Sequence, residues 1–246
     1  MREVLDAMRD VLAQAEGGAL ATITRTTGSV YRREGAKMLC LPGGGMVGSI
    51  SGGCLEADVY EVSLDVVARR LPAIVSYDMH AENDNVWGLG LGCNGTVEVL
   101  VEPLDWWRSP EGAQVFAEIL GRAESGEPCA LATLLPRADG QELRSLPRLL
   151  VAPDGTRTGG RDVALAEPMA AAAGEALASE PRSPSRRVRI GEDDVFVDVM
   201  ASPTPFLIVG AGHDAMPLVR MPRELGFFVV LVDSRPQLAT AERFPE

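Results

Sequence analysis

The sequence predicts an α/β fold in two parts: a mixed α/β domain over residues 1–200 and the start of a Rossmann-like domain over residues 201–246. Three observations predict it. Segments with apolar residues at helical spacing are interspersed with segments in which apolar and polar residues alternate, as in strands. An apolar strand, a glycine turn, a helical run and a second apolar strand follow one another after residue 204. A stretch rich in Ser, Pro and Arg, residues 179–187, has the composition of an exposed loop or linker within the first part.

The elements expected in the first domain follow in order along the chain. Residues 1–15 form an amphipathic helix, and residues 54–70 form a second helix with Leu55, Val59 and Val66 on one face. Residues 43–53 form a turn, and no internal repeat is visible. Strands are expected at 18–26, 36–42, 72–79, 95–104, 129–135, 146–151, 187–190 and 194–200, and further helices at 112–124 and at 164–179, the last interrupted near Pro168.

Composition excludes some classes of function. The chain has 246 residues, 46% of them hydrophobic, and a net charge of −12 from 23 basic and 35 acidic side chains. Such an acidic chain is poorly suited to binding nucleic acid or an anionic membrane. The N-terminal segment has no apolar core of signal-peptide type, and no window reaches transmembrane length. We therefore expect a cytoplasmic protein.

Cysteine and histidine usage argues against a zinc site and against a catalytic triad. No two cysteines form a Cys-x-x-Cys pair, so they are expected to be reduced thiols. Cys40 and Cys129 lie in apolar, strand-like runs and are expected in the core. The two histidines, His80 and His213, lie in unrelated segments, and no nucleophile–base pair is evident. We therefore expect a protein without catalytic turnover of its own.

The segment GSISGGCLEADVYE, residues 48–61, places a thiol in a glycine turn at the start of a predicted helix. Glycines let a backbone approach a ligand closely, and the helix N-terminus adds a partial positive charge that favours anions and lowers a thiol pKa. Gly52, Gly53 and Cys54 therefore form an anion site with free N–H groups, a reactive thiol, or a tight structural turn.

A basic segment precedes this turn. Residues 25–37 contain Arg25, Arg32, Arg33 and Lys37 against the single acidic residue Glu34. This local excess of positive charge, beside glycine turns, suits a ligand that carries a phosphate group. The alternative is an ordinary solvated turn.

The C-terminal segment FLIVGAGHDA carries the spacing of a dinucleotide-binding turn. Gly210 permits the tight turn, Gly212 permits close approach of a pyrophosphate, and Asp233 ends the next strand where a ribose hydroxyl is usually held. The alternative is a Rossmann-like βαβ unit without a nucleotide. Pro222 is expected to kink or break the helix. Only 13 residues of the 246 follow Asp233, so we expect two parallel strands and no tight NAD binding.

Three glycine-rich segments, in this order, resemble the XdhC/CoxI family. They are TRTTGSVYRREGAKM, GSISGGCLEADV and WGLGLGCNGTVEVLVEPL, and the later segment IVGAGHDA resembles the family's C-terminal Rossmann domain. These family members are accessory proteins for molybdenum hydroxylases such as xanthine dehydrogenase. One departure from the family pattern is Asn94, where the family more often has glycine.

The resemblance implies a maturation factor that binds the molybdenum cofactor, assists its sulfuration and inserts it into a molybdenum hydroxylase. The implied partners are that hydroxylase and a cysteine desulfurase, and a homodimer is an expected assembly. The glycine motifs GSISGGCLEADVYE and GLGLGCNG are expected to face each other across one pocket. Which cysteine contacts the metal is left open. The residues expected to contact the molybdenum cofactor are Arg32, Arg33, Lys37, Gly52, Gly53, Cys54, Gly92 and Cys93. Gly210, Gly212 and Asp233 are the residues expected to contact a nucleotide cofactor.

Two other functions remain open at this point. One is a nucleotide-dependent oxidoreductase that uses NAD(P) through Gly210, Gly212 and Asp233. The other is an interaction module that bridges the hydroxylase and a sulfur donor without holding the cofactor.

Overall fold

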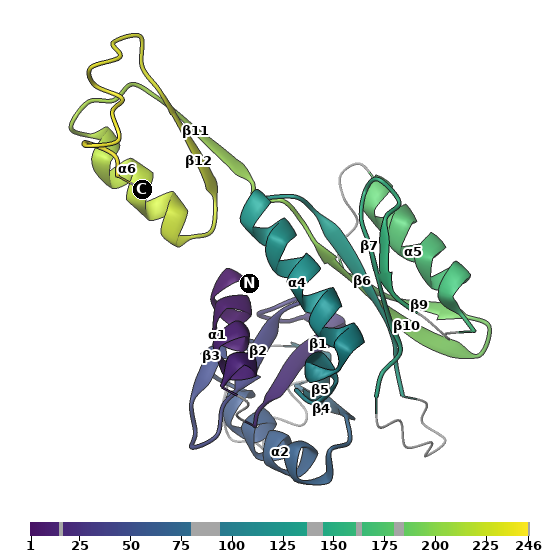
Figure 1. Cartoon of the computed structure of the whole chain (residues 1–246). Helices are drawn as coiled ribbons and strands as arrows, with labels where there is room; N and C mark the ends of the chain where they lie inside the picture. Colours follow the sequence, from purple (N-terminus) through teal and green to yellow (C-terminus); the bar gives the residue numbers. More distant parts are fainter. Residues whose placement is uncertain (15–16, 80–93, 137–144, 161–163, 180–184, 246) are drawn as a thin grey trace. The chain divides into compact units, whose positions relative to one another are not determined.

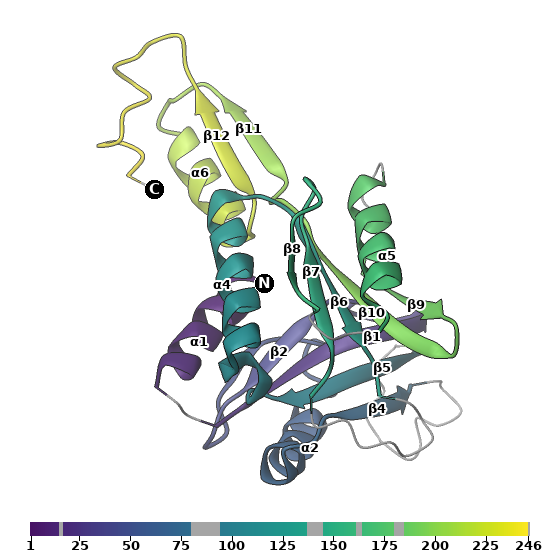
Figure 2. The same ribbon diagram turned by 45° about the vertical axis from the view of Figure 1, so that its right-hand side comes forward.

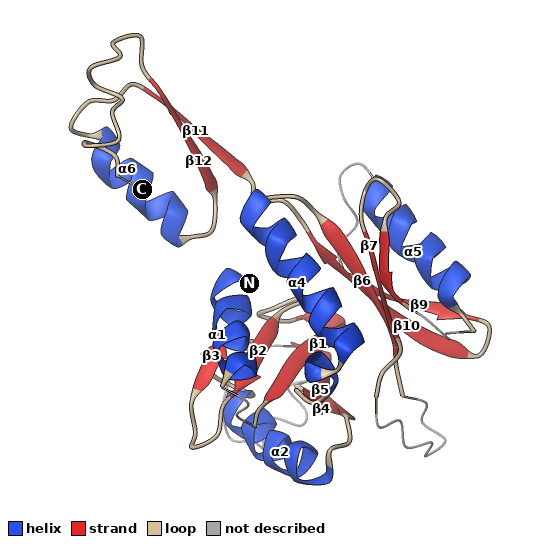
Figure 3. Cartoon of the chain, viewed as in Figure 1, coloured by secondary structure: helices blue, strands red, loops and turns tan. Residues whose placement is uncertain are grey.

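The chain divides into two compact units, Met1–Met200 and Ala201–Glu246 (Figure 1). The structure, a computed structural model, describes residues 1–14, 17–79, 94–136, 145–160, 164–179 and 185–245. Among these residues no helix is long and apolar enough to cross a membrane. The first unit is mixed α/β with antiparallel sheets, and the second has the parallel βαβ arrangement, as predicted (Figure 3).

The first half of the Met1–Met200 unit is built on a five-stranded antiparallel sheet with strand order β3-β2-β1-β5-β4. Residues alternate along β1, so Ala19, Ala21 and Ile23 face helix α2 and pack with its Val59 and Val66. The elements are α1 (Arg2–Ala13), β1 (Ala19–Ser29), β2 (Lys37–Cys40), β3 (Met46–Gly48), α2 (Glu56–Arg69), β4 (Ala73–Asp78) and β5 (Asn94–Pro103).

The second half contains another five-stranded antiparallel sheet, with strand order β8-β7-β6-β10-β9. Ala130, Ala132 and Val197 on one face of this sheet pack against Met169 and Ala173 of α5. The elements are the 3₁₀ helix η1 (Trp106–Arg108), α4 (Pro110–Ser125), β6 (Cys129–Leu134), β7 (Arg148–Val151), β8 (Arg157–Gly159), α5 (Ala166–Ala178), β9 (Arg186–Ile190) and β10 (Asp193–Met200).

The central core lies between the two sheets, on the faces that α2 and α5 leave uncovered (Figure 2). Leu20 and Leu131, on β1 and β6, belong to one buried cluster with residues of α1 and α4. Burying one such leucine contributes about 1.5–3 kcal/mol, so this cluster is a main source of stability for the unit. Cys40 and Cys129 are buried, which confirms the prediction that they lie in the core.

Local sequence explains where helix α4 begins and ends. The hydroxyl oxygen of Ser109 accepts a hydrogen bond from the backbone N–H of Gly112 at 3.0 Å, and Pro110 follows as the first helical residue. Gly126 ends the helix with a φ of 71°, in the left-handed region that glycine tolerates best.

The Ala201–Glu246 unit consists of β11 (Pro205–Val209), α6 (Ala215–Glu224) and β12 (Phe228–Val232). The two strands are parallel neighbours, with Phe206 opposite Val229 and Val209 opposite Val232. This confirms the predicted pairing, with the helix between the strands in sequence. Ile208 and Val219 form the centre of its small core.

Three local expectations are wrong or only partly right. Pro168 does not interrupt α5, because it lies in the first turn, where the missing N–H has no helical partner to lose. Helix α6 continues through Pro222 and ends two residues later. In the segment 179–187, expected to be an exposed loop, Ser185 is buried and Arg186 begins β9, while residues 180–184 lie outside the described residues.

Candidate functional site

The glycine turn singled out in the sequence connects β3 to α2. Its residues adopt no regular structure, and Gly52 and Gly53 have φ values of 81° and 115°. These angles lie in the region that glycine occupies without strain, so the turn depends on both glycines. Cys54 is half-buried, packs against the core cluster under α2 and lies two residues before the helix.

The carboxylate of Glu56, the first residue of α2, fills the concave side of this turn. Its two oxygens accept hydrogen bonds from the hydroxyl groups of Ser49 and Ser51. They also accept hydrogen bonds from five backbone N–H groups, with N···O distances of 2.9–3.2 Å. The donors are Ile50, Ser51, Gly52, Gly53 and Leu55. A ring of converging N–H groups is the usual protein site for an anion, and here the anion is the chain's own side chain.

This network holds the carboxylate strongly in its ionised form. Burial by itself would raise the pKa of Glu56, but the hydrogen bonds from Ser51 and Ser49 outweigh it and lower the pKa to about 2. The expectation that the turn offers free N–H groups is therefore wrong. The sequence shows a glutamate at the first helical position, but only the structure shows how many donors it gathers.

The basic segment lies directly beside the glycine turn. A Cβ atom added to Gly52 would lie 2.8 Å from Cε1 of Tyr31, so the tyrosine ring rests on the glycine backbone. Tyr31 is 72% exposed, and the next two residues, Arg32 and Arg33, are also exposed. Within the described part of the chain neither guanidinium group forms an ion pair or a hydrogen bond. Tyr31, which the sequence analysis missed, therefore links the turn to two exposed guanidinium groups.

Lys37 does not join these arginines. It begins β2, its side chain is 10% exposed, and its ammonium group forms an ion pair with Asp198 of β10. The ammonium also donates to the carbonyl oxygen of Gly35 at 3.3 Å. The charge of Lys37 is therefore neutralised by Asp198 between the two sheets, and it does not add to the exposed charge of Arg32 and Arg33.

The second N-terminal glycine motif cannot be placed, because Gly92 and Cys93 lie outside the described residues. The neighbouring Asn94 begins β5 and pairs with Ser29, two residues before Tyr31. The described chain thus resumes beside the basic segment. Among the described residues no group of three or more His, Cys, Asp or Glu side chains could hold a metal ion.

The turn in the second unit is partly occupied by its own acidic residue. The Asp233 carboxylate accepts the backbone N–H of Ala211 at 2.7 Å, and it forms an ion pair with Arg235 at 2.9 Å. The Arg235 hydrogen bond and the Ala211 N–H lower the pKa of Asp233. Gly210 has a φ of 107° and open space beside it, and Gly212 lies next to the Asp214 side chain. Gly210 thus provides the predicted tight turn, but the carboxylate expected to bind a ribose already has partners.

Family models match two segments of the chain. Residues 3–78 match the XdhC and CoxI family, and residues 206–246 match the XdhC Rossmann domain.

Three known proteins resemble the chain over longer stretches. A protein of Bacillus subtilis (strain 168), described as a probable subunit of xanthine dehydrogenase, is 27% identical over 243 residues, which are 99% of this chain and 66% of that protein. The molybdenum cofactor insertion chaperone PaoD of Escherichia coli (strain K12) is 27% identical over 158 residues, 64% of this chain and 44% of that protein. A crystal structure of a xanthine dehydrogenase from Bacillus halodurans matches with a TM-score of 0.67 and 27% identity, covering 98% of this chain and 65% of that one. The chain thus spans 66% or less of each relative's length.

Proposed function

We propose that the chain is an accessory protein for a xanthine-dehydrogenase-type molybdenum enzyme, because residues 3–78 match the XdhC and CoxI family and residues 206–246 match the XdhC Rossmann domain. In this proposal it binds the molybdenum cofactor as cargo, assists its sulfuration and passes it to the enzyme. The names of two relatives, a cofactor insertion chaperone and a probable xanthine dehydrogenase subunit, support this role.

The observation that carries the proposal is the contact between the basic segment and the glycine turn. Tyr31 on Gly52 places two exposed arginines beside a turn that contains a half-buried thiol. A guanidinium group binds a phosphate through paired hydrogen bonds, and a thiol suits a soft metal or its sulfur ligand. The molybdenum cofactor carries both a phosphate and a metal held by sulfur, so this surface fits its two ends.

Each residue then has a distinct role. Arg32 and Arg33 hold the phosphate, because the N–H groups of the turn are already bound to Glu56. Gly52 and Gly53 let the cofactor lie close to the backbone, and Glu56 keeps the turn in one shape. Cys54 contacts the metal or its sulfur, and Cys93 of the second glycine motif is the candidate for the opposite side.

Binding of purified molybdenum cofactor by charge variants tests the proposal. Arg33→Glu should lower the molybdenum retained after gel filtration, and the loss should shrink as salt is raised, because salt screens the phosphate attraction. Arg69→Glu is a matched control, since Arg69 lies at the other end of α2, about 20 Å along the helix and beyond the screening length at physiological salt. Equal retention by both variants and the parent chain would contradict the assignment.

The thiol has its own test in delivery of the cofactor. Cys54→Ala should retain its fold, because the residue is small and half-buried, yet it should activate the apo-hydroxylase less well than the parent chain. Undiminished activation by Cys54→Ala and by Cys93→Ala would show that neither thiol takes part.

A further inference from the structure

The two halves of the Met1–Met200 unit have the same topology. The first half runs α1-β1-β2-β3-α2-β4-β5, and the second runs α4-β6-β7-β8-α5-β9-β10. Their sheets have the orders β3-β2-β1-β5-β4 and β8-β7-β6-β10-β9, which become identical when each strand is replaced by its counterpart. One helix covers the outer face of each sheet, α2 in the first half and α5 in the second.

Strand registers agree residue by residue. Both β1 and β6 contain the tetrapeptide ALAT, residues 19–22 and 130–133. Thr22 pairs with Lys37 in the first sheet, and Thr133 pairs with Arg148 in the second. A constant shift of 111 positions, from 22 to 133 and from 37 to 148, therefore relates the two halves from α1 to β3 and from α4 to β8.

The same shift reproduces details that topology alone does not require. Gly48 and Gly159 have φ values of 86° and 81°. A Cβ atom on Gly48 would meet the Lys37 carbonyl oxygen and Cγ2 of Val4, and one on Gly159 would meet the Arg148 carbonyl oxygen and Cγ2 of Val115. These neighbours are themselves related by the shift.

The preceding turns match as well. The N–H of Leu41 donates to the carbonyl of Gly45 at 2.8 Å, and that of Ala152 donates to the carbonyl of Thr156 at 2.9 Å. Leu41 and Ala152 are related by the same shift. The repeated tetrapeptide and these spacings were present in the sequence, so the expectation that it contains no repeat was wrong.

The contact between the halves is reciprocal. Lys37 of the first half forms an ion pair with Asp198 of the second, and Arg148 of the second forms one with Glu102 of the first. Glu102 lies opposite Leu20 in the first sheet, and Asp198 lies opposite Leu131 in the second. Because Leu131 is the counterpart of Leu20, the two carboxylates are also equivalent. A contact in which each half gives the other the same pair of groups is isologous, as in a twofold dimer.

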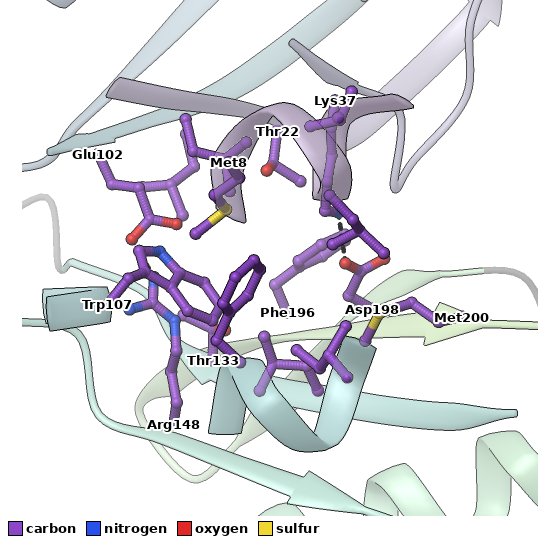
Figure 4. Close-up of a pocket in the computed structure, with 17 residues that line it drawn as sticks. Met8, Thr22, Lys37, Glu102, Trp107, Thr133, Arg148, Phe196, Asp198 and Met200 are labelled. Carbon is purple, nitrogen blue, oxygen red and sulfur yellow. Dashed lines mark hydrogen bonds and ion pairs between the residues drawn. The ribbon is translucent and has the colours of Figure 1, made fainter. Parts of the chain in front are cut away.

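A small cavity of about 40 Å³ lies in this contact (Figure 4). The Lys37–Asp198 pair stands at one side of it and the Arg148–Glu102 pair at the other. Its other walls include counterparts from both halves, namely Leu5 and Phe116, Met8 and Ile119, and Thr22 and Thr133. Equivalent residues of the two halves therefore line the cavity from both sides.

We propose that the Met1–Met200 unit is a fused pair of two copies of one module, and that the second copy is the built-in partner for the inner face of the first. Each copy buries a cation, and among the described residues its carboxylate partner comes from the other copy. A buried cation without its carboxylate is strongly destabilising, so neither inner face is stable alone.

The copies differ at the candidate site. Helices α2 and α5 begin at Glu56 and Ala166, after the N-cap residues Leu55 and Leu165, so the counterpart of Glu56 carries no carboxylate. The next residue, Glu167, forms an exposed ion pair with Arg157 at 2.6 Å. Cys54, the residue before Leu55, corresponds to Ala164, the residue before Leu165. If the proposed function holds, the first copy alone carries the turn and the thiol, and the second copy serves as its support.

Exchange of the two ion pairs tests the fused-pair proposal in the full chain, independently of any ligand. The quadruple variant K37R/D198E/R148K/E102D moves each pair to the other's position and conserves the side-chain types in the core. Lys37→Met and Arg148→Met each leave one carboxylate buried without its cation. The readout is guanidinium unfolding followed by tryptophan fluorescence, to which Trp107 at the cavity wall contributes.

If the positions are equivalent, the exchange should raise the unfolding equilibrium constant by less than about 10-fold, whereas each Met variant should raise it by about 100-fold or more. An exchange variant as unstable as the Met variants would overturn the equivalence. Should the quadruple variant not fold at all, a crystal structure of the parent chain decides instead. The rotation that superposes residues 4–48 on 115–159 should be close to 180° and should carry the Lys37–Asp198 pair onto Arg148–Glu102. A different rotation would refute the proposal.

Discussion

Replacing Glu56 by glutamine removes the negative charge at the centre of the glycine turn while conserving the side-chain shape. The amide keeps one acceptor oxygen but turns an NH₂ group towards backbone N–H donors, so several of the hydrogen bonds in the turn are lost. We expect Glu56→Gln to destabilise the Met1–Met200 unit.

The magnitude follows from the pKa of the carboxylate. A fall from 4.5 to about 2 corresponds to about 3 kcal/mol of stabilisation when taken at full value. The group is only half-buried, and solvent screening reduces this figure, so we expect a loss of about 1–2 kcal/mol at neutral pH.

The sign of the pH dependence is fixed by the direction of the shift. Because the folded pKa lies below the unfolded value, the stabilisation is fully present above about pH 4.5 and is lost as the pH falls towards about 2. Stability of the parent chain should therefore fall over this window, and the Glu56→Gln variant should lack this part of the fall.

Urea unfolding measured from pH 2 to 7 is the assay, with Glu61→Gln as the control because Glu61 is exposed on the same helix. The control should follow the parent chain at every pH. The reasoning fails if Glu56→Gln is as stable as Glu61→Gln at pH 7 and shows the same acid profile, since the carboxylate would then not be held by the turn.

Three further results are expected. Gly52→Ala should destabilise the first unit by more than about 1 kcal/mol, because a φ of 81° strains any other residue and the new Cβ atom would meet Tyr31. The control is Gly121→Ala, because Gly121 lies in a helix with open space beside it. This control should be neutral or stabilising in the same unfolding assay. Burial raises the pKa of the Cys40 thiol and raises that of Cys129 to about 12. Mass spectrometry should therefore find neither thiol alkylated by iodoacetamide at pH 8 until the chain is unfolded. Rapid labelling of Cys129 in the folded chain would contradict its burial. Titration calorimetry should detect no micromolar NAD binding, because Asp233 is already bound to Ala211 and Arg235, and a micromolar affinity would revive the oxidoreductase alternative.

Most helices and strands could be predicted from local patterns. The spacing of Leu55, Val59 and Val66 predicted α2, and the alternation in residues 95–104 predicted β5, because burial of one face imposes these periods directly on the sequence. The parallel pair β11–β12 followed from the strand–turn–helix–strand order alone.

Charge partners could not be predicted in this way. Lys37 belongs by sequence to the basic segment, yet its partner Asp198 is far along the chain and meets it only when the two sheets pack. Glu56 is near the glycines in sequence, but the number of N–H groups that converge on it depends on the φ angles of the turn. The contact of Tyr31 with Gly52 likewise depends on how two separate loops fold together.

Retention of molybdenum by the parent chain tests the central claim most directly. Purified protein is mixed with molybdenum cofactor and gel-filtered, and the molybdenum that elutes with the folded protein is measured against protein concentration. The proposed function predicts molybdenum in the protein peak, saturating at about one atom per chain because the glycine turn and its thiol are present in one of the two copies. A folded chain that elutes without molybdenum at every cofactor concentration would contradict the claim.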